Sequence, residues 1–192
     1  MNMTLPGIDI KFKSGRGAGI TLGEDGVVLI PLIGYCYGPA KEFITIDAYS
    51  PNDKRAKLGC TIDSDKMLLV REALKNAKSV VVYIPAQGAR AVANVAGLKA
   101  EAMYGGTRGN ALTYVIEDNP ASGLMDVAVY LDGQSIEKFE GLKTVGELAA
   151  AGSEWIEFSG DEAAELTATA GVNLAGGADG VATNADYGRI FG

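Results

Sequence analysis

Residues 1–46 read MNMTLPGIDIKFKSGRGAGITLGEDGVVLIPLIGYCYGPAKEFITI and contain two strand patterns of different kinds. In the first, each apolar residue is followed by a charged one, with apolar positions at Ile8, Ile10 and Phe12. This period of two indicates a strand with one apolar face. The second, GVVLIPLI at 26–33, is a continuous apolar run. It predicts a strand over residues 27–33 that is buried on both faces.

The first strand pattern has no local partner, because the segment that follows it, SGRGAG at 14–19, is too rich in glycine to continue a strand. A short strand tethered ahead of a core strand is built like an arm. An unpaired strand is a liability unless another chain takes it up, and strand donation is a known recognition mode. We therefore expect an N-terminal arm over residues 1–20. Its strand would be donated through Ile8, Ile10 and Phe12, and its hinge would be Gly15, Gly17 and Gly19.

A small α/β unit is expected over residues 21–95. EFITID at 42–47 alternates as a strand, SPNDKRAKLG at 50–59 is expected to be a loop, and SVVVYIP at 79–85 predicts a buried strand. Between them, Asp63 or Ser64 can cap a helix that runs to about residue 77. Its buried face would be formed by residues at helical spacing, Met67, Val70, Leu74 and Ala77. The order of strand, helix and strand resembles a crossover onto a sheet.

A strand-rich β domain is expected over residues 96–180, as a small sandwich or barrel. Five segments carry strand patterns: 98–104, 111–118, 124–132, 134–140 and 154–158. Asp132-Gly133 favours a hairpin turn, and a short helix is expected near Val145 and Leu148. Residues 163–170 are a further candidate strand. A helix is expected to start at residues 184–187. The predicted class is α+β and strand-rich.

Composition excludes several classes of function. The 192 residues are 47% hydrophobic and 21% charged, which indicates a globular chain. The net charge is −7 and the pI about 4.7, which argues against nucleic-acid binding. No apolar run reaches the roughly 18 residues that a membrane span needs, so no membrane insertion is expected. We also see no signal peptide at the N-terminus.

The residues give no catalytic, cofactor or metal site. The absence of histidine excludes Ser-His-Asp triads and His-containing metal sites, and Cys36 and Cys60 have no CxxC partner. GRGAGI at 15–20 and GGTRGN at 105–110 match neither nucleotide-binding pattern and fit hinges or turns better. Carboxylate pairs at 154/157 and 161/162 fit solvated positions better than acid–base roles. An aromatic set admits two interpretations, a carbohydrate or receptor platform or a β-domain core, of which the core is favoured: Tyr104, Tyr114, Tyr130 and Trp155.

Three segments together carry a family resemblance. LPGIDIKFKS…GRGAGITLGEDGVVLIPLIGYCYGPAKEFITI is followed by KMLLVREALKNAKSVVVYIP and then by KAEAMYGGTRGNALTYVIED. They resemble the N-terminal portion of contractile phage tail sheath proteins, especially those of Gram-positive myophages and phage-like bacteriocins. The resemblance runs from about residue 6 to about residue 187. Its most specific pieces are G.RG.V..PL, REALK.A and A.Y.GTRGN.L.

The resemblance implies a structural subunit, in N-terminal fragment or short form, that polymerises around a tail tube and contracts to drive it through a target envelope. The implied partners are other sheath subunits, the tail tube protein, the baseplate and the tail terminator. The implied location is the virion tail, after assembly in the bacterial cytoplasm. No cofactor is implied. In the family a pattern like GG.DG….DY opens a further α/β region. The resemblance therefore implies that the β domain over residues 96–180 is inserted into the α/β unit and that residues 181–192 begin the return to it. The α/β unit over residues 21–95 would then be partial, because this chain would lack its remaining strands and helices.

Two other classes of function remain open at this point. The β domain could be a binding module for a host surface or a carbohydrate, because its loops and aromatic residues would suit one. An α/β-type enzyme would need a reactive constellation, which the sequence does not offer.

Overall fold

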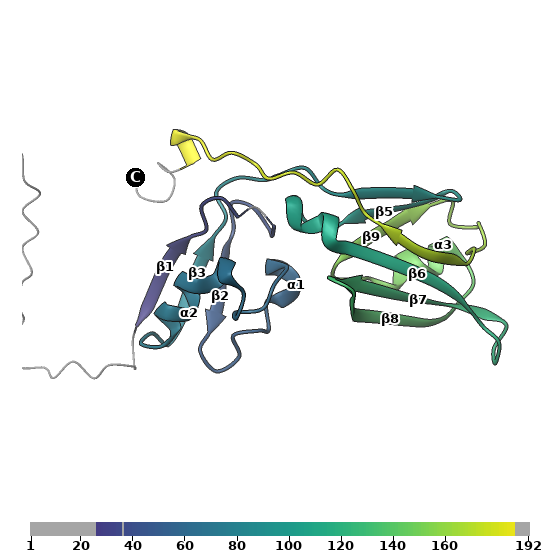
Figure 1. Ribbon diagram of the computed structural model, residues 1–192, viewed down its shortest axis with the longest axis horizontal. Helices are drawn as coiled ribbons and strands as arrows, with labels where there is room; N and C mark the ends of the chain where they lie inside the picture. Colours follow the sequence, from purple (N-terminus) through teal and green to yellow (C-terminus); the bar gives the residue numbers. More distant parts are fainter. Residues whose placement is uncertain (1–25, 36, 187–192) are drawn as a thin grey trace, which may run out of the picture.

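The computed structural model describes residues 26–35 and 37–186, which form two units side by side (Figure 1). The predicted arm lies outside the described residues, and so do its six expected site residues and Cys36. The fold is strand-rich with a few short helices, which confirms the α+β class.

The first unit, residues 26–84, is a three-stranded sheet with helices on one side, and we call it the small unit. Its strand order is β1-β3-β2, with β1 parallel and β2 antiparallel to the central β3. The strands are β1 (Val27–Pro31), β2 (Phe43–Asp47) and β3 (Ser79–Tyr83). The helices are α1 (Arg55–Leu58), the 3-10 turn η1 (Asp65–Met67) and α2 (Leu68–Leu74). The segment expected to be a loop at 50–59 therefore contains α1.

Helix α2 covers one face of this sheet, as its apolar spacing predicted. Ser64 caps η1 by accepting a hydrogen bond from the Lys66 backbone N–H at 3.4 Å. Met67, Val70 and Ala77 are buried against Val80 and Val82 of β3. The helix ends at Leu74, earlier than expected, and residues 75–77 continue in a turn held by the Ala77 N–H on the Ala73 carbonyl. The predicted buried face is confirmed, with Leu74 only partly buried.

Strand β1 contradicts the expectation of a strand buried on both faces. Val27 is 64% exposed, Val28 38% and Leu29 41%. The reason is position, because β1 forms an edge of the sheet and pairs only with β3 among the described strands. A continuous apolar run predicts a strand whose two faces are covered by other elements. The described residues do not supply that cover for β1.

The second unit, residues 86–179, is a two-sheet sandwich (Figure 1). One sheet has the order β10-β6-β7-β8 and the other β4-β5-β9. The first sheet is built from β6 (Leu112–Asn119), β7 (Leu124–Leu131), β8 (Gln134–Leu142) and β10 (Thr169–Asn173). The second is built from β4 (Val92–Val95), β5 (Leu98–Ala102) and β9 (Ile156–Gly160). Helix α3 (Val145–Ala151) and the 3-10 turn η2 (Thr107–Ala111) complete the unit.

The five strand segments and the short helix expected from the sequence are present. The Asp132-Gly133 hairpin also forms, with φ of 52° and 76° and Leu131 opposite Gln134. Strand β4 was not expected. It pairs with β5, although it lies on the N-terminal side of the expected boundary between residues 95 and 96. The four expected domain ranges stay a prediction.

The strand expected at 163–170 lies further along the chain, at β10 (Thr169–Asn173). Residues 164–166 instead run beside the segment that leads into α3. The Val145 N–H donates to the Ala164 carbonyl, and the Leu166 N–H donates to the Lys143 carbonyl. Leu166 is buried, and pairing with β6 begins only at Thr169, with a register shift between Thr169 and Val172.

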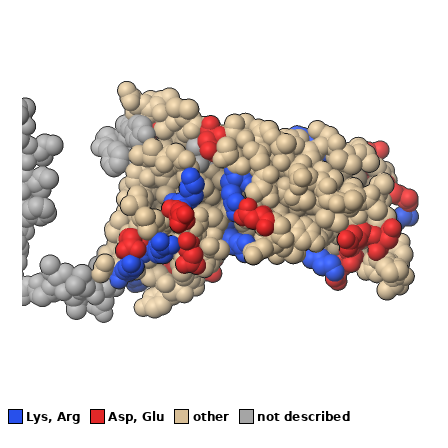
Figure 2. Space-filling model, in the orientation of Figure 1, with Lys and Arg blue, Asp and Glu red and all other residues tan. Residues whose placement is uncertain are grey.

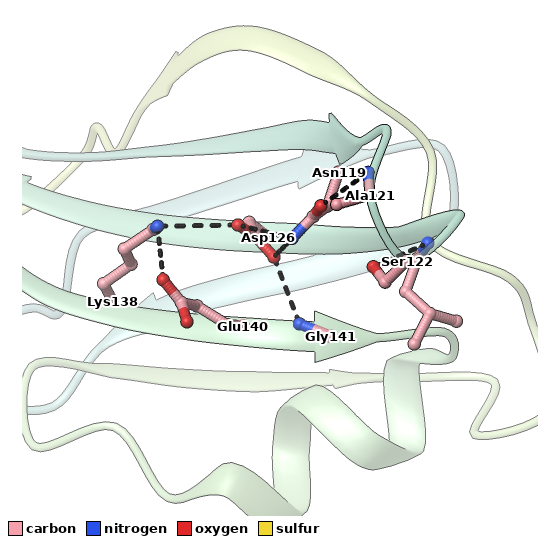
Figure 3. A network of polar contacts seen from close by, with 8 residues as sticks. Asn119, Ala121, Ser122, Asp126, Lys138, Glu140 and Gly141 are labelled. Carbon is pink, nitrogen blue, oxygen red and sulfur yellow. Dashed lines mark hydrogen bonds and ion pairs between the residues drawn. The ribbon is translucent and has the colours of Figure 1, made fainter.

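The outer strand β8 departs from regular pairing twice, between Val129 and Tyr130 and between Met125 and Val127 of its partner β7. At the second irregularity Gly141 adopts a φ of 72°. Its N–H donates to the Asp126 carboxylate at 3.1 Å. Figure 3 shows Asp126 also accepting from the Asn119 side-chain amide and lying beside Lys138, whose ammonium is 3.5 Å away. These contacts fix a β-bulge in the edge strand.

Candidate assembly surface

The exposed large hydrophobic residues are distributed unequally between the two units. All of them lie in the small unit except Val181, which follows the sandwich: Val27, Val28, Leu29, Ile33, Phe43, Tyr49, Leu68, Leu69 and Val181. None lies within residues 86–179, all of which the structure describes. The sandwich therefore exposes no large hydrophobic side chain, whereas the small unit exposes several. Apolar surface left in water on one unit is the usual mark of a protein contact.

The sheet face opposite α2 carries much of this apolar surface. The register places Val27 beside Ser79 and Leu29 beside Val81. Phe43 lies opposite Tyr83, and their rings are 5.2 Å apart. Phe43 keeps 63% of its surface exposed. We call this the open sheet face. A sheet with a helix on one side and an apolar second side lacks one layer of the usual α/β arrangement.

The two edge strands of the small unit differ in how well they are covered. In β2, Ile44 is 5% and Ile46 is 1% exposed, so its inward side is buried under the helices. In β1, Val27 and Leu29 on the open sheet face are exposed, and so is Val28 on the helix side, where only Ile30 packs against the core. This is how a central strand looks without its neighbours. The β1 edge can accept a further strand, and the open sheet face can accept a further layer.

A polar cleft of about 630 Å³ lies where the two units meet. Figure 2 shows charged side chains of both signs gathered at this boundary. Arg108 donates to both carboxylate oxygens of Asp132, at 2.9 and 2.5 Å, and Asp179 accepts from the N–H and the hydroxyl of Thr107. Tyr35 faces Cys60, 3.5 Å from its Sγ, and burial raises the pKa of the Tyr35 hydroxyl. Both pairs lie within the sandwich, and they order its side of the cleft.

Neither a metal cluster nor a membrane-spanning helix is found in the described part of the chain. Residues 26–35 and 37–186 contain no group of three or more His, Cys, Asp or Glu placed to hold a metal ion. They also contain no helix long and apolar enough to cross a membrane.

The residues predicted to be functional are different from those that form the open sheet face and the β1 edge. Ile8, Ile10, Phe12, Gly15, Gly17 and Gly19 lie outside the described residues, so their roles stay predictions. Sequence reasoning missed the open sheet face. A signal was available, because Phe43 is a large aromatic residue on the outward positions of an otherwise clean alternation, FITID.

Of the four aromatic residues singled out in the sequence, Tyr114 and Trp155 lie in the core of the sandwich and Tyr104 packs against it. Trp155 is 4% exposed and Tyr114 is fully buried, with its ring 5.5 Å from Phe158 in an edge-to-face arrangement. Tyr104 and Tyr130 are half-buried.

Two family models match this chain, one for each unit. Residues 26–83 match the tail sheath protein Gp18 domain III N-terminal region. Residues 86–179 match the phage tail sheath protein beta-sandwich domain. Together the matches cover the small unit and the sandwich.

Two curated relatives from Bacillus subtilis (strain 168) are similar over most of the chain. The phage-like element PBSX protein XkdK is 38% identical over 199 residues, which takes in 94% of this chain and 41% of the relative. The uncharacterized protein YqbK has the same identity and the same coverage. The chain therefore spans about two fifths of the length of the curated relatives it matches.

Two crystal structures of sheath tail proteins superimpose on the chain. The protein from Desulfitobacterium hafniense is 37% identical, with a TM-score of 0.77 over 96% of this chain and 42% of its own. The protein from Listeria innocua is 35% identical, with a TM-score of 0.76 over 91% of this chain and 38% of its own. Since each unit alone is at most about half of the chain, scores this high require both units to superimpose together.

Proposed function

The chain belongs to the phage tail sheath proteins, and we propose that it is a structural, non-enzymatic subunit of a contractile tail sheath. The observation that carries this proposal is the uncovered apolar surface of the small unit, in a family whose members are sheath proteins. A sheath is a protein polymer, so its subunits need surfaces that other polypeptide chain covers. The open sheet face and the β1 edge supply such surfaces, and the sandwich lacks exposed large hydrophobic residues.

Assembly would then depend on the small unit. A contact between two different surfaces of one subunit does not close on itself and builds a helical filament. We propose that the strand through Ile8, Ile10 and Phe12 is donated to a neighbouring subunit, and that Gly15, Gly17 and Gly19 let this connection bend. The polypeptide that extends the relatives beyond the matched region is a second source of cover for the open sheet face.

Contraction would be a switch between two packings of the same subunits around a tail tube. The sandwich would lie on the outside and contribute little to the contacts between subunits. The further partners are the tail tube protein, the baseplate and the tail terminator. The location is the virion tail, after assembly in the host cytoplasm.

A carbohydrate- or receptor-binding role for the sandwich is the weaker candidate. Its motivation was a sandwich with exposed loops, together with an aromatic platform, and of those aromatic residues Trp155 and Tyr114 belong to the core instead.

The experiment is electron microscopy of the purified chain, alone and mixed with a full-length sheath protein from the same source. We expect the chain to enter or cap sheath tubes. Phe43→Asp, which charges the open sheet face, and Ile10→Asp, which charges the arm, should both reduce this. Ala121→Asp adds the same charge to an exposed turn of the sandwich and should leave it unchanged. Equal incorporation of all three variants would contradict the proposal.

A further inference from the structure

Tyr37 belongs to the small unit in sequence and to the sandwich in packing. It lies between β1 and β2, yet it is 1% exposed inside the hydrophobic core of the sandwich. Its ring meets Tyr104 edge-on at 5.6 Å and lies 6.5 Å from the ring of Trp155. The core of the sandwich is therefore completed by a side chain from the other unit.

Arg108 makes the reciprocal connection. It starts from η2 of the sandwich, and its Nε donates to the Gly59 carbonyl of the small unit at 2.7 Å. Its two terminal nitrogens are held by Asp132 of the β7–β8 hairpin. The guanidinium is thus fixed by its own unit while it bonds the other. Hydrogen bonds from a charged donor are roughly twice as strong as neutral ones.

Gly59 is the point where the two connections meet. Its φ is 67°, at the left-handed end of α1. A Cβ at Gly59 would lie 2.6 Å from the ring of Tyr37 and 2.9 Å from the Cγ of Arg108. A side chain here would push both away. We call Tyr37, Gly59 and Arg108 the seam latch.

The first and last segments of the sandwich, next to its two connections to the small unit, are packed against each other. They form an antiparallel bridge through Ala89 and Ala178, and Figure 1 shows the two segments running side by side. The Ala89 carbonyl accepts from the N–H groups of both Gly106 and Ala178, at 2.9 and 3.2 Å. A Cβ at Gly88 would overlap the Ala178 carbonyl oxygen, and one at Gly105 would overlap Gly88. Because they have no side chain, Gly88 and Gly105 let backbone segments approach each other closely, which requires a fixed geometry and not the flexibility of a hinge.

We propose that the seam latch joins the small unit and the sandwich into one cooperative body, so that the sandwich keeps its orientation whenever the small unit moves. Two units joined by connectors are normally expected to move independently unless their interface is large and apolar. Here Tyr37 of the small unit is buried in the core of the sandwich, and Arg108 of the sandwich donates a charged hydrogen bond to the Gly59 carbonyl of the small unit. The two chain segments next to the connections between the units also pack against each other. This proposal is independent of whether the chain assembles into a sheath.

The test uses calorimetry and small-angle X-ray scattering on the full chain. We expect wild type to unfold in one transition whose calorimetric and van't Hoff enthalpies agree. Arg108→Gln removes the charged hydrogen bond, and Gly59→Ala inserts a methyl group into the latch. Both should separate the transition into two and increase the radius of gyration of the folded protein, because the sandwich then samples other orientations.

Matched controls separate the latch from general destabilisation. Arg71→Gln makes the same chemical change at an arginine that bonds only Asp63 of its own unit among the described residues. Gly97→Ala also places alanine at a positive φ, 84°, where no atom lies within 4 Å of the new methyl group. Both controls should keep one transition and an unchanged radius. Two transitions in wild type would overturn the proposal, and so would latch variants that lower the melting temperature without separating the transition or changing the scattering.

Discussion

Replacing Tyr114 by phenylalanine should stabilise this protein. Tyr114 lies in β6 at the centre of the sandwich and is fully buried, and its hydroxyl bonds to none of the described residues. Burial also raises the pKa of this hydroxyl, which reflects the same loss of water. A buried polar group without a partner costs about 1–3 kcal/mol, because folding removes its hydrogen bonds to water and returns none. Phenylalanine removes the hydroxyl and keeps the ring contact with Phe158.

The expected gain is therefore at least about 1 kcal/mol, or about 2–4 °C in melting temperature for a chain of this size. Urea unfolding should show a higher midpoint with an unchanged slope, since the surface exposed on unfolding is the same. Tyr49→Phe is the matched control, because that side chain is 91% exposed and its hydroxyl stays in water; its midpoint should not change measurably. A loss of about 1 kcal/mol in Tyr114→Phe would show that the hydroxyl has a partner, such as an enclosed water, and would refute the reasoning.

Three further outcomes follow from the same structure. Phe43→Ser should weaken association with other sheath subunits about five- to thirty-fold, because burying the 63% of Phe43 that is exposed contributes about 1–2 kcal/mol; an unchanged sedimentation isotherm would contradict this. Gly88→Ala should lower the free energy of unfolding in urea by about 1–3 kcal/mol, because the new methyl group overlaps the Ala178 carbonyl. The control Gly26→Ala meets only ordinary contacts, and equal losses of stability in the two variants would refute the close approach at Gly88. Hydrogen bonds from Asn119 and the Gly141 N–H, with Lys138 nearby, hold the pKa of Asp126 below its usual range. The ionised carboxylate therefore stabilises the fold above its unfolded pKa of about 3.9, and this contribution disappears as the pH falls through the lower folded value. The urea midpoint should therefore fall further between neutral and acid pH in wild type than in Asp126→Asn. The same pH dependence in both proteins would contradict the stabilising role of the Asp126 carboxylate.

Local patterns predicted the local structure well. The alternation in EFITID predicted a strand that forms as β2, and Asp132-Gly133 predicted a hairpin that forms. Both signals depend on neighbours within a few residues. The short helix near Val145 was likewise within reach, because its capping and apolar spacing are local.

Features that depend on distant chain were not predictable in the same way. The run VVLIP indicated burial on both faces, and the observed edge position reflects which neighbours are present. Strand β10 begins late because residues 164–166 are held by the segment before α3. Tyr37 and Arg108 act across the boundary between units, and no spacing along the chain reveals that a tyrosine near β1 completes the core of the sandwich.

The bulge held by Asp126 has a consequence for crowding. When many copies of a protein are held side by side at high local concentration, regular outer strands on neighbouring copies tend to join into one continuous sheet. The kinked β8 edge cannot offer an unbroken row of backbone donors and acceptors to a neighbouring copy. Sandwiches placed close together would therefore stay separate bodies that can slide past each other, and changes in their spacing would require no hydrogen-bonded sheet to be torn apart.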